Sequence, residues 1–140
     1  MAGKRGRGNR ADNRGETFYV PPAPPEDNSS TPKFCLAHLV SGYNLDPLDK
    51  PAQAAFAIAL QKRSSLTWGQ IMLIDRHGLG YEFLPVDKFK CPPPHRFEGT
   101  EKFMVFRYHG KLPMAGVRIR DTFHVLWIER QYGELYDHGS

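Results

Sequence analysis

The stretch EKFMVFRYHGKLPMAGVRIRDTFHVLWIERQYGELYDH, residues 101–138, holds the strongest β-strand patterns in the chain. Its runs at 103–108 and 123–128 consist of aromatic and branched residues, which suit the pleated, half-buried surface of a sheet. Short connections at 110–111 and 121–122 join the runs, so consecutive strands are expected to pair antiparallel. The stretch therefore predicts a three-stranded antiparallel meander over residues 103–109, 112–120 and 123–129.

Upstream of this stretch the pattern predicts one further strand and a first helix. Residues 33–40 (KFCLAHLV) alternate in the way that a half-buried strand does. Asp49 is a favourable N-cap for a helix that continues to Arg63. One face of that helix is expected to carry Ala52, Phe56, Ala59 and Arg63.

A second helix is predicted directly after the first. Thr67 and Gln70 have the spacing of a capping box, in which each side chain satisfies a free backbone amide of the other residue. Gly78 is expected to end this helix in a left-handed conformation. Residues 78–100 then predict an extended piece at 81–84 and a proline-stiffened connection, since consecutive prolines cannot join a central strand.

Length and composition predict one α+β domain behind a basic tail. The chain has 140 residues, so a single domain over residues 32–140 is expected. Residues 1–31 combine a Lys- and Arg-rich start with the proline run PPAPP and predict a disordered tail. The formal charge of +4 fits an anionic partner, of which nucleic acid is the commonest.

Several classes of protein are not expected. The longest apolar-rich run, AAFAIAL, is far short of the ~20 residues that cross a membrane, and the start of the chain lacks the apolar core of a signal peptide. Cys35 and Cys91 are too few for a disulfide framework. The sequence therefore predicts a cytoplasmic protein with reduced thiols and no membrane partner.

The motifs Cys35-x-x-His38 and Cys91-x-x-x-His95 supply the ligand types of a zinc site. Three consecutive prolines separate Cys91 from His95, and a polyproline helix rising ~3.1 Å per residue would hold these two residues roughly 12 Å apart. Ligands of one zinc ion must lie much closer together. No metal and no other cofactor is therefore predicted, and the cysteines are interpreted as free thiols.

Two nucleic-acid hypotheses compete. Residues 50–77 could form a helix-turn-helix of a non-catalytic nucleic-acid-binding module, although the second helix offers few base-reading side chains beyond Gln70. The alternative places the chemistry on the C-terminal strands. Arg107 and Arg118 could hold a phosphate, and His138 and Tyr136 could transfer protons in RNA cleavage. A solvated sheet face with ordinary surface arginines accounts for the same pattern.

The order of elements and several local motifs resemble the RelE/ParE toxin superfamily, small basic proteins of bacterial toxin–antitoxin pairs. The motifs are VFRY (105–108), AGVRIR (115–120), FHVLWIER (123–130) and a closing LY at 135–136. By this resemblance Arg118 corresponds to the middle-strand arginine and Tyr136 to the terminal tyrosine. Arg107 and Arg130 match basic residues on the preceding strand and after the last strand.

The resemblance implies an endoribonuclease that cleaves mRNA, possibly on the ribosome, needs no metal and is neutralised by a protein antitoxin. The side chains expected to bind the nucleic acid are Lys102, Lys111, Arg120, His124 and Arg130. Lys102 and Lys111 are a reduced version of the family's lysine-rich patch. Relatives of the ParE type share the fold but act on gyrase, so the fold alone leaves the activity open. An interaction protein of phage or plasmid origin is a third alternative.

Overall fold

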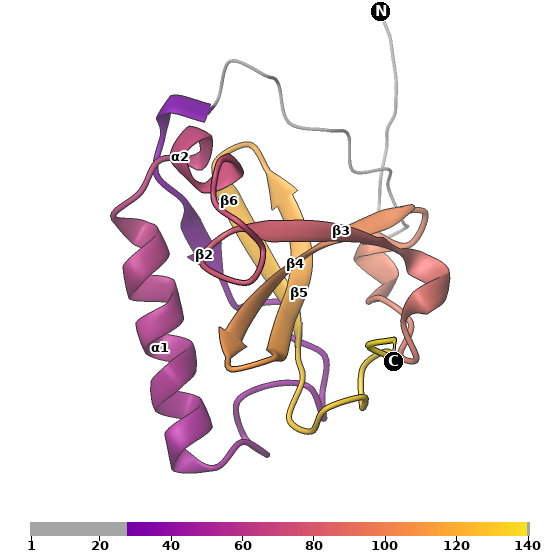
Figure 1. Ribbon diagram of the computed structural model, residues 1–140. Helices are drawn as coiled ribbons and strands as arrows, with labels where there is room; N and C mark the ends of the chain where they lie inside the picture. The colour runs from indigo at the N-terminus through magenta and orange to yellow at the C-terminus, as the bar shows by residue number, and fades with distance from the viewer. Residues whose placement is uncertain (1–27, 140) are drawn as a thin grey trace, which may run out of the picture.

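The computed structural model describes residues 28–139, so most of the expected N-terminal tail lies outside the described residues. Within them the chain forms an α+β fold with a five-stranded mixed sheet in the order β2-β6-β5-β4-β3 (Figure 1). The strands are β2 (Lys33–Cys35), β3 (Tyr81–Pro85), β4 (Lys102–His109), β5 (Leu112–Ile119) and β6 (Thr122–Ile128). The helices are α1 (Lys50–Ser64), α2 (Trp68–Met72) and the short 3-10 turns η3 (Val86–Lys88) and η4 (His95–Phe97).

The sheet differs from the predicted three-stranded meander. Strands β4, β5 and β6 pair antiparallel in chain order, but β2 pairs parallel with β6 and β3 pairs antiparallel with β4. Strand β3 includes the extended piece expected at 81–84. The strand joins the sheet because Tyr81 packs against the core on one face of the sheet and Leu84 packs against the core on the other face.

Helix α1 forms as the sequence predicts. The Asp49 side chain accepts the Ala52 amide at 2.9 Å, and a proline occupies the first turn, where no amide is needed. The buried residues of the helix are those of the expected stripe, Ala52, Phe56, Ala59 and Arg63. This stripe packs the helix along one face of the sheet (Figure 1).

Helix α2 begins as predicted and ends early. The capping box is present, with the Gln70 amide donating to the Thr67 hydroxyl and the Thr67 amide donating to the Gln70 side chain. The helix ends at Met72, not near Gly78. The Asp75 carboxylate accepts the His77 amide at 2.8 Å, a local turn that competes with helical hydrogen bonding.

Two hydrophobic cores lie on opposite faces of the sheet. The helix face packs against α1 and α2, and the C-terminal face packs against the segments at 84–97 and 135–136. Buried residues of the first core include Phe56, Trp68, Ile71, Phe106, Met114, Phe123 and Val125. Buried residues of the second core are Phe97, Phe103, Val105, Ala115, Val117, Leu126, Trp127, Leu135 and Tyr136.

A β-bulge in β6 changes which side chains the strand sends to each face. Ala115 pairs with Trp127 and Gly116 pairs with Val125, so Leu126 is the extra residue. Leu126 and Trp127 consequently both lie in the core of the C-terminal face. Gly116 is required opposite the bulge, because a Cβ there would collide with the backbone carbonyl of His124.

The turn between β5 and β6 falls one residue earlier than predicted. Ile119 pairs with Thr122, so Arg120 and Asp121 form the connection. Arg120 has a φ of 57°, a left-handed conformation that costs an ordinary side chain some strain. The Lys33 ammonium, 2.6 Å from the Asp121 carboxylate, and the Lys33 amide, which donates to the Asp121 carbonyl, hold this turn against β2.

Candidate active site at the C-terminal end of the sheet

A buried carboxylate and an imidazole form the centre of the candidate site. Glu129 directly follows β6, and its side chain is fully buried. One carboxylate oxygen accepts the Leu135 amide at 2.9 Å, and the other lies 2.8 Å from Nε2 of His138, whose side chain is 8% exposed. The chain after β6 therefore turns back and returns His138 to the end of the strand that carries Glu129.

The surroundings of Glu129 fix the state and the orientation of this pair. Burial raises the pKa of Glu129 above its ordinary value, while the Leu135 amide and His138 act in the opposite direction. A carboxylate bonded to one nitrogen of an imidazole fixes the ring's orientation and leaves the second nitrogen for other chemistry. Glu129 and His138 thus have the arrangement of a positioned proton-transfer group.

Two tyrosine rings enclose the imidazole. The ring centroids of Tyr132 and His138 lie 4.0 Å apart, and those of Tyr136 and His138 lie 4.3 Å apart. Burial, assisted by the nearby Glu129 charge, raises the pKa of Tyr136 well above its ordinary value, so its hydroxyl keeps its proton at neutral pH. Tyr136 is therefore a hydrogen-bond donor here and not a base.

Arg107 is the cation that lies with this group. It alternates along β4 with Val105, which packs in the core of the C-terminal face, and its charge lowers the pKa of Tyr136 against the effect of burial. Glu82 of β3 acts on the same tyrosine and forms an ion pair with Arg76 at 2.8 Å. The structure thus brings together three of the four predicted catalytic side chains, Arg107, Tyr136 and His138.

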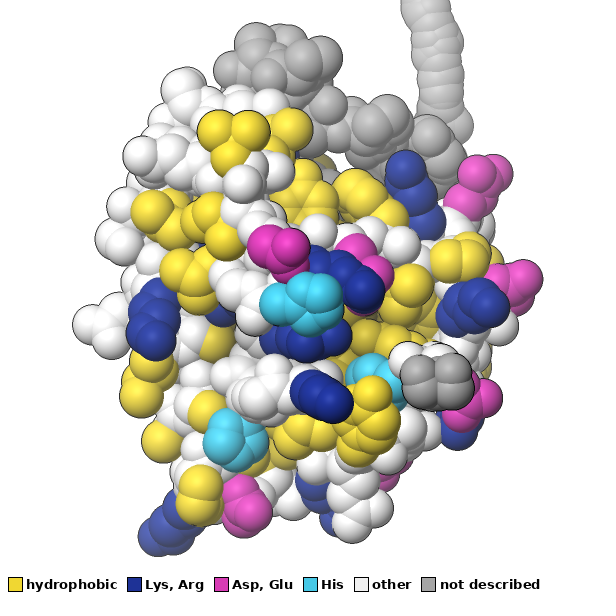
Figure 2. Space-filling view, in the orientation of Figure 1, with side chains coloured by type: hydrophobic (Ala, Val, Ile, Leu, Met, Phe, Trp, Pro, Cys, Tyr) yellow, Lys and Arg dark blue, Asp and Glu magenta, His cyan; other side chains and the backbone are white. Residues whose placement is uncertain are grey.

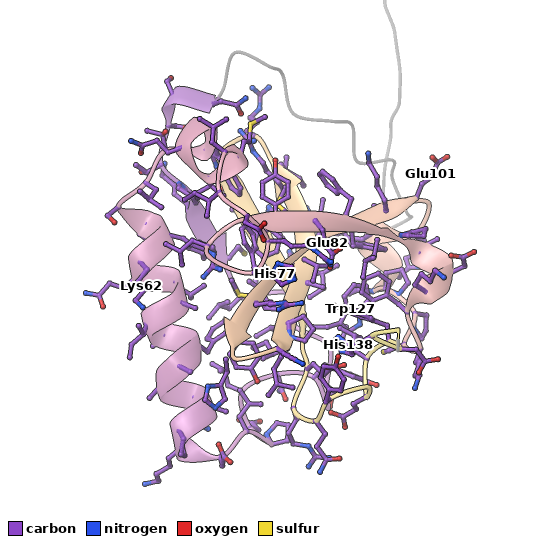
Figure 3. The ribbon with its side chains drawn as sticks, in the orientation of Figure 1. Lys62, His77, Glu82, Glu101, Trp127 and His138 are labelled. Carbon is purple, nitrogen blue, oxygen red and sulfur yellow. The ribbon has the colours of Figure 1, made fainter. Side chains whose placement is uncertain are left out.

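Positive and histidine side chains surround this region on the molecular surface. Figure 2 shows Lys, Arg and His side chains in the middle of the face in view, with Asp and Glu side chains directly beside them. Figure 3 shows His77, Glu82 and His138 in the middle of the same view. An anionic chain approaching this surface would meet cations beside the Glu129–His138 pair.

Arg118, the fourth predicted catalytic side chain, lies apart from the other three. Its guanidinium covers the ring of Trp68 at 4.2 Å from the centroid, and its Nε donates to the Arg120 carbonyl at 2.6 Å. Trp68 belongs to the core of the helix face, whereas Tyr136 belongs to the opposite core. The expected convergence of Arg118 with Arg107 and Tyr136 is therefore absent, because alternation along β4 and β5 directs the two arginines to opposite faces.

The five predicted nucleic-acid-binding residues do not form one surface. Lys111 in the β4–β5 turn and Arg130 after β6 lie at the end of the sheet that carries the site. Arg130 pairs with Glu134 at 3.3 Å. Lys102 and Arg120 lie towards the other end, where Lys102 covers the Phe83 ring at 4.5 Å. His124 lies on the C-terminal face, next to Cys35 in the β2–β6 register.

Sequence reasoning missed Glu129 and Tyr132. A carboxylate directly after an apolar strand is a weak signal, since most such residues mark the return of the chain to solvent. The closing segment at 130–138 decides its role, because that segment covers Glu129 and supplies the Leu135 amide and His138. No periodicity in the sequence reports this return.

The helix-turn-helix hypothesis gains no support from the geometry. Helix α2 has 5 residues, with Trp68 and Ile71 buried in the core. The Gln70 side chain, the expected base reader, is engaged in the capping box.

A membrane-crossing helix is absent from the described part of the chain, since no helix there has the required length and apolar character.

Comparisons with known proteins add no relative. No protein-family model, no curated protein and no solved structure matches the chain. The assignment of a function to the Glu129–His138 region therefore rests on its own geometry and chemistry.

Proposed function

We propose that this protein is a toxin-type endoribonuclease that cleaves mRNA and is neutralised by a protein antitoxin. The observation that carries the proposal is the buried Glu129–His138 pair, with its 2.8 Å contact, on the same face as Arg107 and Tyr136. RNA cleavage through the 2′-hydroxyl requires a base, cations for the negatively charged phosphorane and a donor near the phosphate. These side chains supply all three.

His138 is the proposed base. Glu129 engages Nε2, so Nδ1 is the nitrogen that accepts the proton of the 2′-hydroxyl. The 2′-oxygen then forms its bond to phosphorus, the bond from phosphorus to the 5′-oxygen breaks, and that oxygen takes a proton from solvent. The products carry a 2′,3′-cyclic phosphate and a 5′-hydroxyl. Glu129 stabilises the imidazolium while the phosphorane exists.

Arg107 and Tyr136 act on the phosphate. The planar guanidinium matches two phosphate oxygens and stays charged at every working pH. Tyr136, whose pKa is raised by burial, retains the proton with which it donates to a phosphate oxygen. Arg118 is assigned a structural role on the helix face, and this assignment replaces the central position that the resemblance to RelE-type toxins gave it.

The antitoxin and ribosome parts of the proposal rest on the surface. Among the described strands β3 lies at an edge of the sheet, and Phe83 on it is 45% exposed, while Leu73 in the preceding loop is 88% exposed. A strand edge with exposed apolar side chains beside it suits pairing with a segment of another protein. The net charge of +4 suits an RNA-rich target such as the translating ribosome.

The test is induced expression in bacteria of the full chain and of His138→Gln, followed by mapping of RNA ends. We expect the parent to arrest growth and to leave messages with 2′,3′-cyclic phosphate ends, and the variant to do neither. His95→Gln is the matched control, because His95 faces Glu98 at 3.4 Å but both side chains are exposed. Normal growth with intact messages at equal expression of the parent would exclude the proposal.

A further inference from the structure

We propose that Cys35, His38 and His124 form a binding site for Zn²⁺ that links β2 to β6. One potential ligand atom from each residue lies within 4.8 Å of the other two. This group is distinct from the proposed RNA-cleaving centre, since His124 and Glu129 are five positions apart along and just after β6, roughly 16 Å at ~3.3 Å per residue.

The sheet register places two of the three ligands side by side. Cys35 is the Cα partner of His124 in the parallel pairing of β2 with β6. The preceding pair, Phe34 and Phe123, makes an edge-to-face ring contact in the core of the helix face. Because side chains alternate along both strands, Cys35 and His124 both project from the C-terminal face.

A turn after β2 supplies the third ligand. The strand ends at Cys35, and the chain turns at Ala37 and His38. The ring centroid of His38 consequently lies 5.9 Å from that of His124. Both imidazoles also contact the ring of Phe97, at 5.4 Å and 6.0 Å, which supports one side of the group. Cys35 and His38 thus come from one Cys-x-x-His motif. His124, which is 89 positions after Cys35 in the chain, comes from β6.

One ring nitrogen of His124 independently supports a bound ion. Its Nδ1 is buried and has no hydrogen-bond partner within residues 28–139. A buried polar atom without a partner costs stability, and a bound metal ion is one of the partners that removes this cost. Cys91 and His95, by contrast, are not grouped with these residues, so the Cys/His pair of the proline-rich connection takes no part.

The donor set decides the class of metal. One thiolate and two imidazoles are borderline-soft ligands and favour Zn²⁺ over Mg²⁺ or Ca²⁺. Zinc bonds of ~2.0–2.3 Å need the ligand atoms somewhat closer together than they lie here, which small side-chain rotations of partly exposed residues provide. All three residues are partly exposed, so the ion can enter and solvent can occupy the fourth position. The Cys35 thiolate offsets part of the ion's charge beside Arg96, whose charge acts on His124.

The bound ion would fasten a weak edge of the sheet. Strand β2 has 3 residues and pairs with β6 alone among the described strands. A zinc ion held by Cys35 and His38 on one side and His124 on the other would cross-link this short strand to the sheet. Binding of the ion to the folded state alone would raise the melting temperature.

The test is titration of the reduced, chelator-treated full chain with Zn²⁺, and with Co²⁺ as a spectroscopic probe. We expect one equivalent of either ion to bind and Co²⁺ to give a thiolate charge-transfer band. Cys35→Ser and His124→Gln should each weaken binding by more than ~100-fold, beyond the 10–100-fold typical of losing an outer partner. Cys91→Ser and His95→Gln are the matched controls and should bind as the parent does.

The site would be overturned by a lack of stoichiometric binding to the parent, by binding that survives in Cys35→Ser, or by binding that Cys91→Ser abolishes. Misfolding is separated from ligand loss by His38→Gln, which removes a ligand from a turn outside the strands. This variant should lose the Zn²⁺-dependent rise in melting temperature while keeping the metal-free melting temperature of the parent. A rise equal to that of the parent would also overturn the site.

Discussion

The two faces of the sheet use their charged side chains in different ways. On the helix face, Arg63 and Arg118 are engaged with backbone carbonyls and aromatic rings. On the C-terminal face, Glu129 and His138 form a buried pair that can exchange a proton. Arg63 and Arg118 are covered by an aromatic core and have a structural role. Arg107, by contrast, lies on the face that carries the titratable pair.

Arg63 is the clearest structural cation of the helix face. It is 1% exposed, and its guanidinium lies 4.8 Å from the centroid of the Phe106 ring. Burial lowers the pKa of Arg63 to about 10, so it remains charged at neutral pH. The carbonyls that accept its hydrogen bonds are those of Ala59, Gly78, Leu79 and Arg107.

The strongest contrast between the faces is expected in RNA cleavage by two matched arginine variants. Arg107→Met should lower the cleavage rate by ~10²–10³, because removing one preorganised donor from a transition state has an effect of that size. Arg118→Met should change the rate less than ~3-fold, since its guanidinium lies on the opposite face. Rates on a defined RNA with both proteins at equal folded fraction check the contrast. Equal losses in the two variants would remove the distinction between the faces.

For the free energy of unfolding, the larger effect is expected from the arginine of the helix face. Arg63→Met is expected to lower the free energy of unfolding by about 3–4 kcal/mol, because buried carbonyls on the helix, on the 78–79 loop and on β4 lose their donor. Arg107→Met should cost less than about 1 kcal/mol, as its side chain is only half-buried. Urea denaturation measures both. If Arg63→Met leaves the free energy of unfolding unchanged, the stability of the helix face does not depend on the Arg63 guanidinium.

A hydrogen bond links the core of the helix face to the backbone of Glu129. Tyr108 packs in the core of the helix face, and its hydroxyl donates to the backbone carbonyl of Glu129 at 2.6 Å. Tyr108→Phe should lower the free energy of unfolding by about 1–1.5 kcal/mol, the value of one buried hydrogen bond. Tyr43→Phe, whose hydroxyl contact to the Glu134 carbonyl is long at 3.5 Å, is the control and should cost less.

The smallest expected effect concerns pH. Burial raises the pKa of Glu129 from its ordinary 4.5, so the folded state holds this proton to a higher pH than the unfolded state does. This contribution to stability is present below pH ~4.5 and is lost as the pH rises through the folded pKa. Glu129→Gln should remove this slope, so the difference in unfolding free energy between the variant and the parent should change as the pH rises above 4.5.

Urea denaturation at several pH values measures this slope. Glu98→Gln alters a carboxylate that also faces a histidine but is 57% exposed. Its curve should run parallel to that of the parent. A Glu129→Gln curve parallel to the parent's would contradict the account of Glu129 as a carboxylate destabilised by burial.

Local sequence patterns predict the two helices. The pairing of β3 with β4 could not be predicted in this way, because it depends on contacts between residues far apart in the chain. The Asp49 cap, the α1 stripe and the Thr67–Gln70 capping box were predictable because each depends on residues within one or two turns. The early end of α2 follows from the Asp75 turn, a competing local bond that the apolar stripe concealed. The pairing of β3 with β4 depends on contacts with both cores, which periodicity does not report.

The candidate sites show the same division. The residue types that phosphate chemistry needs predict Arg107, Tyr136 and His138, and these three side chains lie together. The same criterion predicts Arg118, which lies on the other face against Trp68, 50 positions earlier in the chain. Cys35 and His124 meet only through the parallel register of β2 with β6.

That parallel register also has a consequence for the order of events in folding. Lys33 and Asp121, which link β2 to the β5–β6 turn, are 88 residues apart, so β2 cannot complete its pairing until β6 has been made. At a synthesis rate of ~5–20 residues per second, the interval between the two segments is roughly 4–18 s. During that time β6, the strand that β2 pairs with among the described strands, has not yet been made, whereas α1 can form at once. Folding is therefore expected to complete only after β6 has left the ribosome, and the Cys35–His124 and Glu129–His138 pairs then form in its last steps.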